Sequence, residues 1–126
     1  MAVSRKKSRE IVFRMLFPES VGQAELFELA SEGETPAKPE RDYIDNLYKQ
    51  ATENMEEVDR VLVECLEGFT IDRVFKTDLA ALRLGIAEIK YTATDKKVVI
   101  NECVEIAKKY GTEKSAGFVN SVLAKV

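Results

Sequence analysis

The stretch that decides the fold runs from Leu79 to Tyr91 and reads LAALRLGIAEIKY. Its only charged residues are Arg83, Glu88 and Lys90, and at about 100° per residue they do not gather into one broad solvated face. A helix that is apolar around most of its circumference has to be covered on several sides. We therefore expect this segment to be a central helix against which the other helices pack.

Helical periods flank the central segment on both sides, and strand-like alternation of Val, Ile and Thr is nearly absent. The chain is therefore predicted to be all-α, with about seven helices including the central one. We expect a linker at residues 33–39, because Pro36 and Pro39 break helices. The other predicted helices span about residues 4–17, 21–30, 40–53, 55–67, 99–110 and 115–123.

Several helix ends carry capping signals. Ser4 is predicted to cap the first helix and Thr77 the central one. Asn54 offers a further cap, with Glu57 as its capping-box partner. Whether the helices on either side of Asn54 form one bent rod or two separate helices stays open. Gly117 is expected to allow a close approach between the last helix and its neighbours.

Composition excludes many kinds of catalytic and metal site. The chain contains no histidine, which removes the commonest general base and metal ligand, and no glycine-rich phosphate loop follows a strand. Cys65 and Cys103 lie on apolar helix faces without a second ligand at a metal-like spacing, so reduced core thiols are expected. We therefore predict no enzymatic activity, no cofactor and no metal. Since no segment resembles a signal peptide or reaches transmembrane length, we expect a cytoplasmic protein without a membrane partner.

The net charge of −3 is distributed unevenly along the chain. Residues 1–17 carry a net charge of +4, residues 18–67 one of −10, and residues 68–126 one of +3. A local basic patch on an otherwise acidic protein suits selective binding of an anion, because the rest of the surface repels nonspecific nucleic acid. The first cations stand at a helix N-terminus, where positive charge opposes the helix dipole. This placement favours a functional role for them.

Several motifs resemble one family along nearly the whole chain. Residues 98–111 read VVINECVEIAKKYG and residues 118–123 read FVNSVL, and both are similar to the C-terminal signature of the NusB family of transcription antitermination factors. Residues 71–73 (IDR) and 81–89 (ALRLGIAEI) are similar to the central helix of that family. Residues 5–10 (RKKSRE) resemble its arginine-rich start.

The resemblance implies one domain over residues 1–126, with two packed three-helix bundles around the central helix. The bundles would cover about residues 1–54 and about residues 55–126. The resemblance also implies a pair with the ribosomal protein NusE, binding of single-stranded boxA RNA, and a role in the antitermination complex of RNA polymerase on ribosomal RNA operons. Whether the chain forms a homodimer stays open. The alternative is a helical protein-protein scaffold without specific RNA binding.

The resemblance assigns roles to individual residues. Asp78 and Arg83 are expected to contact NusE. Asp78 would equally suit the first turn of a helix, and Arg83 needs a carboxylate partner in so apolar a helix. An aromatic residue at helical spacing belongs to the core more often than it stacks on bases, so Phe17 and Phe118 keep that alternative. The residues expected to bind RNA are Arg5, Lys6, Lys7, Arg9, Phe17, Lys114 and Phe118.

Overall fold

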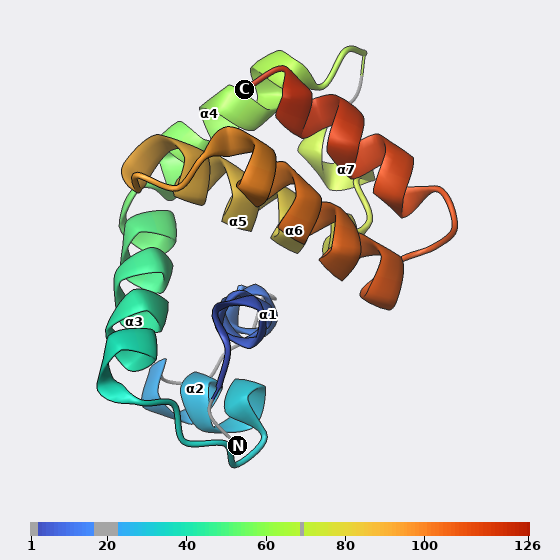
Figure 1. Ribbon diagram of the computed structural model, residues 1–126. Helices are drawn as coiled ribbons and strands as arrows, with labels where there is room; N and C mark the ends of the chain where they lie inside the picture. The colour runs from blue at the N-terminus through green and yellow to red at the C-terminus, as the bar shows by residue number, and fades with distance from the viewer. Residues whose placement is uncertain (1–2, 17–22, 69) are drawn as a thin grey trace.

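The computed structural model describes residues 3–16, 23–68 and 70–126, which contain helices and no strand (Figure 1). The prediction of an all-α chain is confirmed. A short 3₁₀ turn, η1, covers Ile71–Arg73. The helices are α1 (Arg5–Met15), α2 (Gln23–Ser31), α3 (Lys38–Glu53), α4 (Met55–Cys65), α5 (Lys76–Tyr91), α6 (Lys96–Tyr110) and α7 (Ser115–Ala124).

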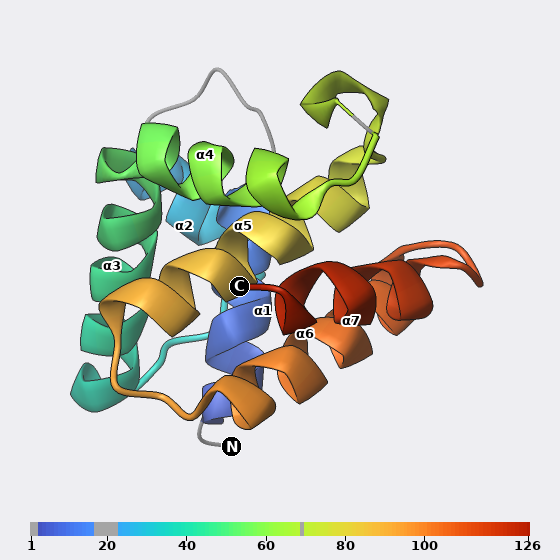
Figure 2. The same ribbon diagram turned by 90° about the horizontal axis from the view of Figure 1, so that it is seen from above.

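Helix α5 is the centre of the fold, as its apolar circumference predicts. It packs against α1, α3, α4, α6 and α7. Figure 2 shows α4 on one side of α5 and α6 with α7 on the other. The side chains of Leu82, Leu84 and Ile86 are completely buried. Buried apolar residues from all seven described helices form one continuous core, while the division into bundles near residue 54 stays a prediction.

The start of α5 differs from the prediction. The helix begins at Lys76, and Phe75 occupies the N-cap without a side-chain hydrogen bond. Thr77 therefore lies inside the first turn, so its predicted role as the cap is wrong. With Phe75 as the N-cap, Asp78 is still in the first turn, where a carboxylate interacts favourably with the helix dipole.

Helices α3 and α4 are two separate helices that meet at Asn54 (Figure 1). The predicted capping box is wrong, because the Asn54 side chain makes no cap hydrogen bond and instead donates to the carbonyl oxygen of Gln50 at 2.9 Å. Helix α3 also begins before the predicted end of the linker, with Pro39 in its first turn. Proline is tolerated there because the N–H groups of a first turn have no partner within the helix.

The glycine that allows other helices to approach closely is Gly85 of α5, not Gly117. A Cβ atom on Gly85 would lie 2.8 Å from Cδ1 of Leu123 and 3.1 Å from Sγ of Cys103, whereas one on Gly117 would meet no atom within 4 Å. Both cysteines are free and buried, which confirms the expectation of reduced core thiols. Burial raises the pKa of the Cys103 thiol. None of the described helices has the length and apolar character needed to cross a membrane.

Candidate nucleic-acid interface

The first turn of α1 presents positive side chains to solvent. Ser4 caps the helix as predicted, since its Oγ accepts a hydrogen bond of 3.0 Å from the backbone N–H of Lys7. Arg5 and Lys6 are exposed, and Lys7 is half-buried. Within the described part of the chain, neither Lys6 nor Lys7 forms an ion pair. Both lysines can therefore offer their charge to an anion.

Arg5 is held in one orientation by α3. Its Nε and Nη2 donate to the two carboxylate oxygens of Glu40 at 2.8 and 3.1 Å, and its guanidinium carbon lies 4.0 Å from the centre of the Tyr43 ring. The hydrogen bond from Arg5, joined by one of 2.8 Å from Ser8, holds the pKa of the Glu40 carboxyl below its usual range. Because 47% of the Arg5 side chain is exposed, this fixed group remains part of the surface.

The prediction that Arg9 belongs to the exposed basic end of α1 is wrong. Arg9 is 5% exposed and faces α5, where its Nε and Nη2 donate to the Glu88 carboxylate at 2.8 and 2.9 Å. Glu88 is completely buried and also accepts a hydrogen bond of 2.8 Å from the Tyr43 hydroxyl. Burial and the charge of Glu88 raise the pKa of Tyr43, so its hydroxyl stays protonated and can donate. Since α1 packs against α5, a side chain one turn beyond Arg5 meets a buried carboxylate instead of solvent.

Glu10 binds the neighbouring cations of α1 and α6. It accepts hydrogen bonds from Lys109 at 2.6 Å, from Arg14 at 3.0 Å and from the Tyr110 hydroxyl. Burial alone would raise the pKa of Glu10, but the hydrogen bonds from Lys109 and Tyr110 outweigh it and lower that pKa. Arg14 also pairs with Glu32 at 2.6 Å. The charges of Arg14 and Lys109 are therefore used largely to join α1 to α2 and α6.

A second surface lies where the start of α5 meets the start of α7. A groove of about 310 Å³ is lined there by Phe75, Asp78, Lys114 and Phe118. Phe75 is 62% exposed, whereas Asp78 is 5% exposed, and no described residue donates a hydrogen bond to its Oδ1. A buried carboxylate oxygen without a donor is costly, and a bound molecule that supplied a donor would remove this cost. The groove thus combines an apolar wall with an unsatisfied acceptor.

The remaining predicted residues divide between these surfaces and the interior. Arg83 donates two hydrogen bonds of 2.9 Å to Asp59 of α4, which confirms that it needs a carboxylate partner within the apolar helix. Lys114 and Phe118, predicted to bind RNA, line the groove beside Asp78. Phe17 lies outside the described residues.

Four residues that fix α1 were not identified from the sequence, namely Glu88, Glu40, Tyr43 and Glu10. One signal was present: Glu88 is a charge in an apolar helix, and such a group needs a partner when it is buried. Glu88 meets this condition as fully as Arg83 does. The basic run on α1 does not show which of its cations would pair with Glu88.

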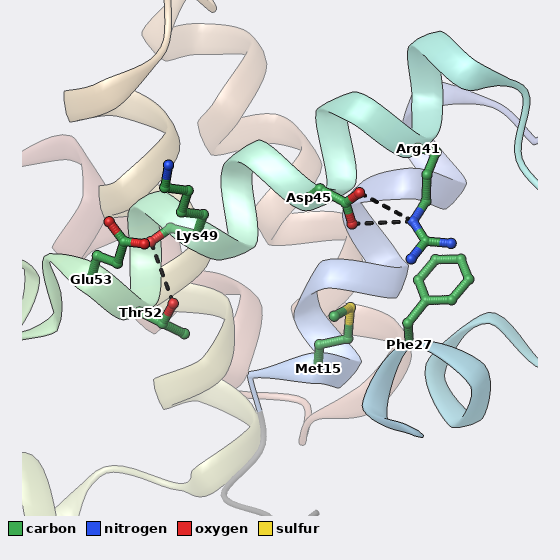
Figure 3. A pocket seen from close by; sticks show the side chains of 7 residues that line it. All are labelled: Met15, Phe27, Arg41, Asp45, Lys49, Thr52 and Glu53. Carbon is green, nitrogen blue, oxygen red and sulfur yellow. Dashed lines mark hydrogen bonds and ion pairs between the residues drawn. The ribbon is translucent and has the colours of Figure 1, made fainter. Parts of the chain in front are cut away.

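Figure 3 shows a further cavity, of about 550 Å³, between α3, the end of α1 and α2. Met15 and Phe27 form its buried floor. The guanidinium carbon of Arg41 lies 3.6 Å from the centre of the Phe27 ring, and its Nε donates to Asp45 at 3.1 Å. Because the nearby charges neutralise each other, this cavity has no excess charge with which to select a ligand.

Comparison with known proteins agrees with the geometry. The model of the NusB family matches residues 6–126. The chain belongs to the NusB family. The transcription antitermination protein NusB of Agathobacter rectalis is 44% identical to this chain over 129 residues, with 98% of each chain covered. NusB of Thermus thermophilus is 39% identical over 134 residues, which cover 97% of this chain and 89% of the relative.

Solved NusB structures share the fold. A crystal structure of the antitermination factors NusB and NusE in complex with dsRNA matches with a TM-score of 0.85 and 31% identity, over 95% of this chain and 92% of that chain. A structure of T. maritima NusB matches with a TM-score of 0.89 and 29% identity, over 99% of this chain and 91% of that chain. The family resemblance drawn from the sequence motifs is therefore confirmed.

Proposed function

We propose that this protein is an RNA-binding transcription antitermination factor that acts as a pair with the ribosomal protein NusE. Membership of the NusB family supports the role in antitermination, and the related complex of NusB, NusE and dsRNA supports both partners. The observation that carries RNA binding is the first turn of α1, where Lys6 and Lys7 have no ion-pair partner among the described residues on a chain of net charge −3.

In this proposal Lys6 and Lys7 contact phosphates of single-stranded boxA RNA. Arg9 contacts no RNA and positions the basic turn from beneath. Its hydrogen bonds to Glu88 fix the rotation of α1 on α5. A bidentate arginine-carboxylate pair defines geometry more strictly than a lysine pair, so the lysines keep a fixed spacing along the RNA backbone.

We assign the groove between α5 and α7 to NusE. Asp78 would accept a hydrogen bond from the partner, and the exposed ring of Phe75 would be covered by an apolar side chain. Lys114 and Phe118 line the same groove, so we propose them as contacts to NusE in place of their predicted contacts to RNA. Arg83 is bonded to Asp59 of α4, is only 20% exposed and does not line the groove, so we propose a structural role for it in place of its predicted contact to NusE.

The protein would act by binding its partners and would catalyse no reaction. It would do so in the cytoplasm, as part of the antitermination complex of RNA polymerase on ribosomal RNA operons. Titration of the protein with boxA RNA and with a scrambled RNA, each with and without NusE, tests this proposal. We expect weak binding of boxA RNA by the protein alone and tighter binding by the pair, because the pair offers one larger basic surface.

The rival function is a protein-protein scaffold without specific RNA recognition. The groove favours this rival, because a protein partner without any RNA would be enough to cover Phe75 and to donate a hydrogen bond to Asp78. Equal affinities of the NusE pair for boxA and scrambled RNA would support the scaffold and exclude the proposed function. Failure of NusE to co-purify with the protein would exclude the assignment of the groove.

A further inference from the structure

The surroundings of Arg5 differ from those of a cation that is free to bind a phosphate. The edge of its guanidinium formed by Nε and Nη2 is already bonded to both oxygens of Glu40, at 2.8 and 3.1 Å. This is the edge geometry with which arginine grips a phosphate or carboxylate in a bidentate way. Glu40 also neutralises the charge of Arg5. Arg5 therefore has little of the free charge and free edge that phosphate binding uses.

The two faces of the guanidinium are also unequal. One face lies on the Tyr43 ring, 4.0 Å from its centre. Tyr43 is itself held from below, since its hydroxyl donates to Glu88 and the guanidinium carbon of Arg9 lies 5.7 Å from the ring centre. Tyr43 covers one face and Glu40 one edge, so what the 47% exposed side chain of Arg5 can still offer a ligand is the opposite face and the Nη1 edge.

We propose that this open face of Arg5 is a stacking platform for one unpaired base of single-stranded RNA. Tyr43, Arg5 and the base would then form a stacked column. Proteins that recognise single-stranded RNA commonly stack splayed bases on aromatic rings or guanidinium planes. Glu40 and Ser8 hold the plane in place before RNA arrives, so the stack forms without ordering a mobile side chain.

This inference rests on the proposed function and gives Arg5 a base contact in place of the phosphate contact expected from the sequence. The two roles differ in what they require of the side chain. A phosphate contact needs charge, which lysine also has, whereas a stack needs the planar group that lysine lacks. A stack should also depend on the presence of a base, while a phosphate contact should not.

The test uses the complex with NusE and compares the wild-type protein with Arg5→Lys. The probes are the boxA single strand and a set of the same strand in which one nucleotide at a time is abasic, so that every phosphate is retained. For the wild type, one abasic position should weaken binding about fivefold to hundredfold, the range measured for base-aromatic stacks. Arg5→Lys should bind the intact strand more weakly by a similar factor, and the same abasic position should then have no further effect.

Controls separate stacking from charge and from folding. Arg60→Lys makes the same change at an exposed arginine of α4 and should retain binding, and thermal melts should show that each variant is folded. The salt dependence of binding should be equal for wild type and Arg5→Lys, because the charge is conserved. A duplex of the same sequence should bind both proteins equally, since the faces of its bases are covered by their neighbours.

Two results would overturn the inference: equal affinity of Arg5→Lys and wild type for the intact strand, or an equal loss at every abasic position in both proteins. A wild-type complex that fails to prefer boxA over scrambled RNA is a different result. It would exclude the proposed function, and the stacking platform with it.

Discussion

The central helix α5 carries two buried carboxylates whose surroundings are opposite. Near its end, Glu88 is completely buried and accepts hydrogen bonds from Arg9 and Tyr43. In its first turn, Asp78 is 5% exposed, and no described residue donates to its Oδ1. Burial alone therefore does not distinguish a structural carboxylate from the partner contact that we propose for Asp78. The difference we use is the presence or absence of an internal donor.

The two sites also face different neighbours. Glu88 binds α1 and α3 to α5, so it fixes the helix that carries the basic turn. Asp78 opens into the groove beside Phe75 and Phe118, where apolar surface is exposed. A paired charge inside the core defines the geometry of the fold, whereas an unsatisfied one beside exposed apolar surface suits a docking site.

The largest effect is expected from breaking the paired site. Arg9→Met should lower the free energy of unfolding by about 3 to 5 kcal/mol, because Glu88 would be left buried without its charged partner. The measurement is urea unfolding at neutral pH. Arg5→Met is the matched control, and its loss should stay below about 1 kcal/mol because the Arg5–Glu40 pair is at the surface. Equal losses in the two variants would contradict the distinction between them.

The unpaired site should respond in the opposite way. Asp78→Leu should change the free energy of unfolding by no more than about 1 kcal/mol, since it removes a costly buried acceptor and loses a favourable interaction with the helix dipole. The same variant should bind NusE at least about tenfold more weakly, because a hydrogen bond to a charged group is removed. Calorimetric titration with NusE measures this, with Asp42→Leu at an exposed position of α3 as the control. Unchanged NusE affinity would show that Asp78 is not a partner contact.

A smaller effect should appear at low pH through Glu10, a third carboxylate with internal donors. Its pKa is lower in the folded protein than in the unfolded chain. The ionised group therefore contributes its full stabilisation above the unfolded pKa of about 4.3, and this contribution is lost as the pH falls through the folded pKa. Glu10→Gln should be less stable than wild type at pH 7, and the gap should narrow on acidification. Urea unfolding across that pH range measures the difference in the free energy of unfolding between the two proteins. A difference that stays constant would show that Glu10 does not stabilise the fold in this way.

The sequence predicts the elements of this fold well because they depend on local pattern. The apolar circumference of residues 79–91 identified the central helix, and the periodicity of residues 99–110 identified α6 despite its opening Val-Val-Ile. Helix ends were predicted less well. Thr77 and Asn54 both have side chains suited to caps, but packing of the surrounding chain placed one inside a helix and turned the other back toward Gln50.

The candidate sites were harder to predict, because they depend on which helix faces which. Arg5 and Arg9 belong to one basic run, yet only Arg9 meets the buried carboxylate of α5. Similarly, Lys114 and Phe118 are far in sequence from Asp78 and come together only when α7 packs beside the start of α5. The spacing of residues along the chain does not indicate these side-chain contacts. A charged residue in an apolar helix does indicate that it must have some partner.

The central claim is that a rigid helix holds Lys6 and Lys7 against the RNA backbone. The salt dependence of boxA binding by the complex with NusE tests it most directly. For the double variant Lys6→Gln/Lys7→Gln, the slope of log affinity against log salt should be flatter than that of wild type by about 1.4, or about 0.7 for each lysine that no longer meets a phosphate. Lys49→Gln/Lys90→Gln, which removes the same charge from exposed positions on α3 and α5, should leave the slope unchanged. A wild-type slope in Lys6→Gln/Lys7→Gln would contradict the account.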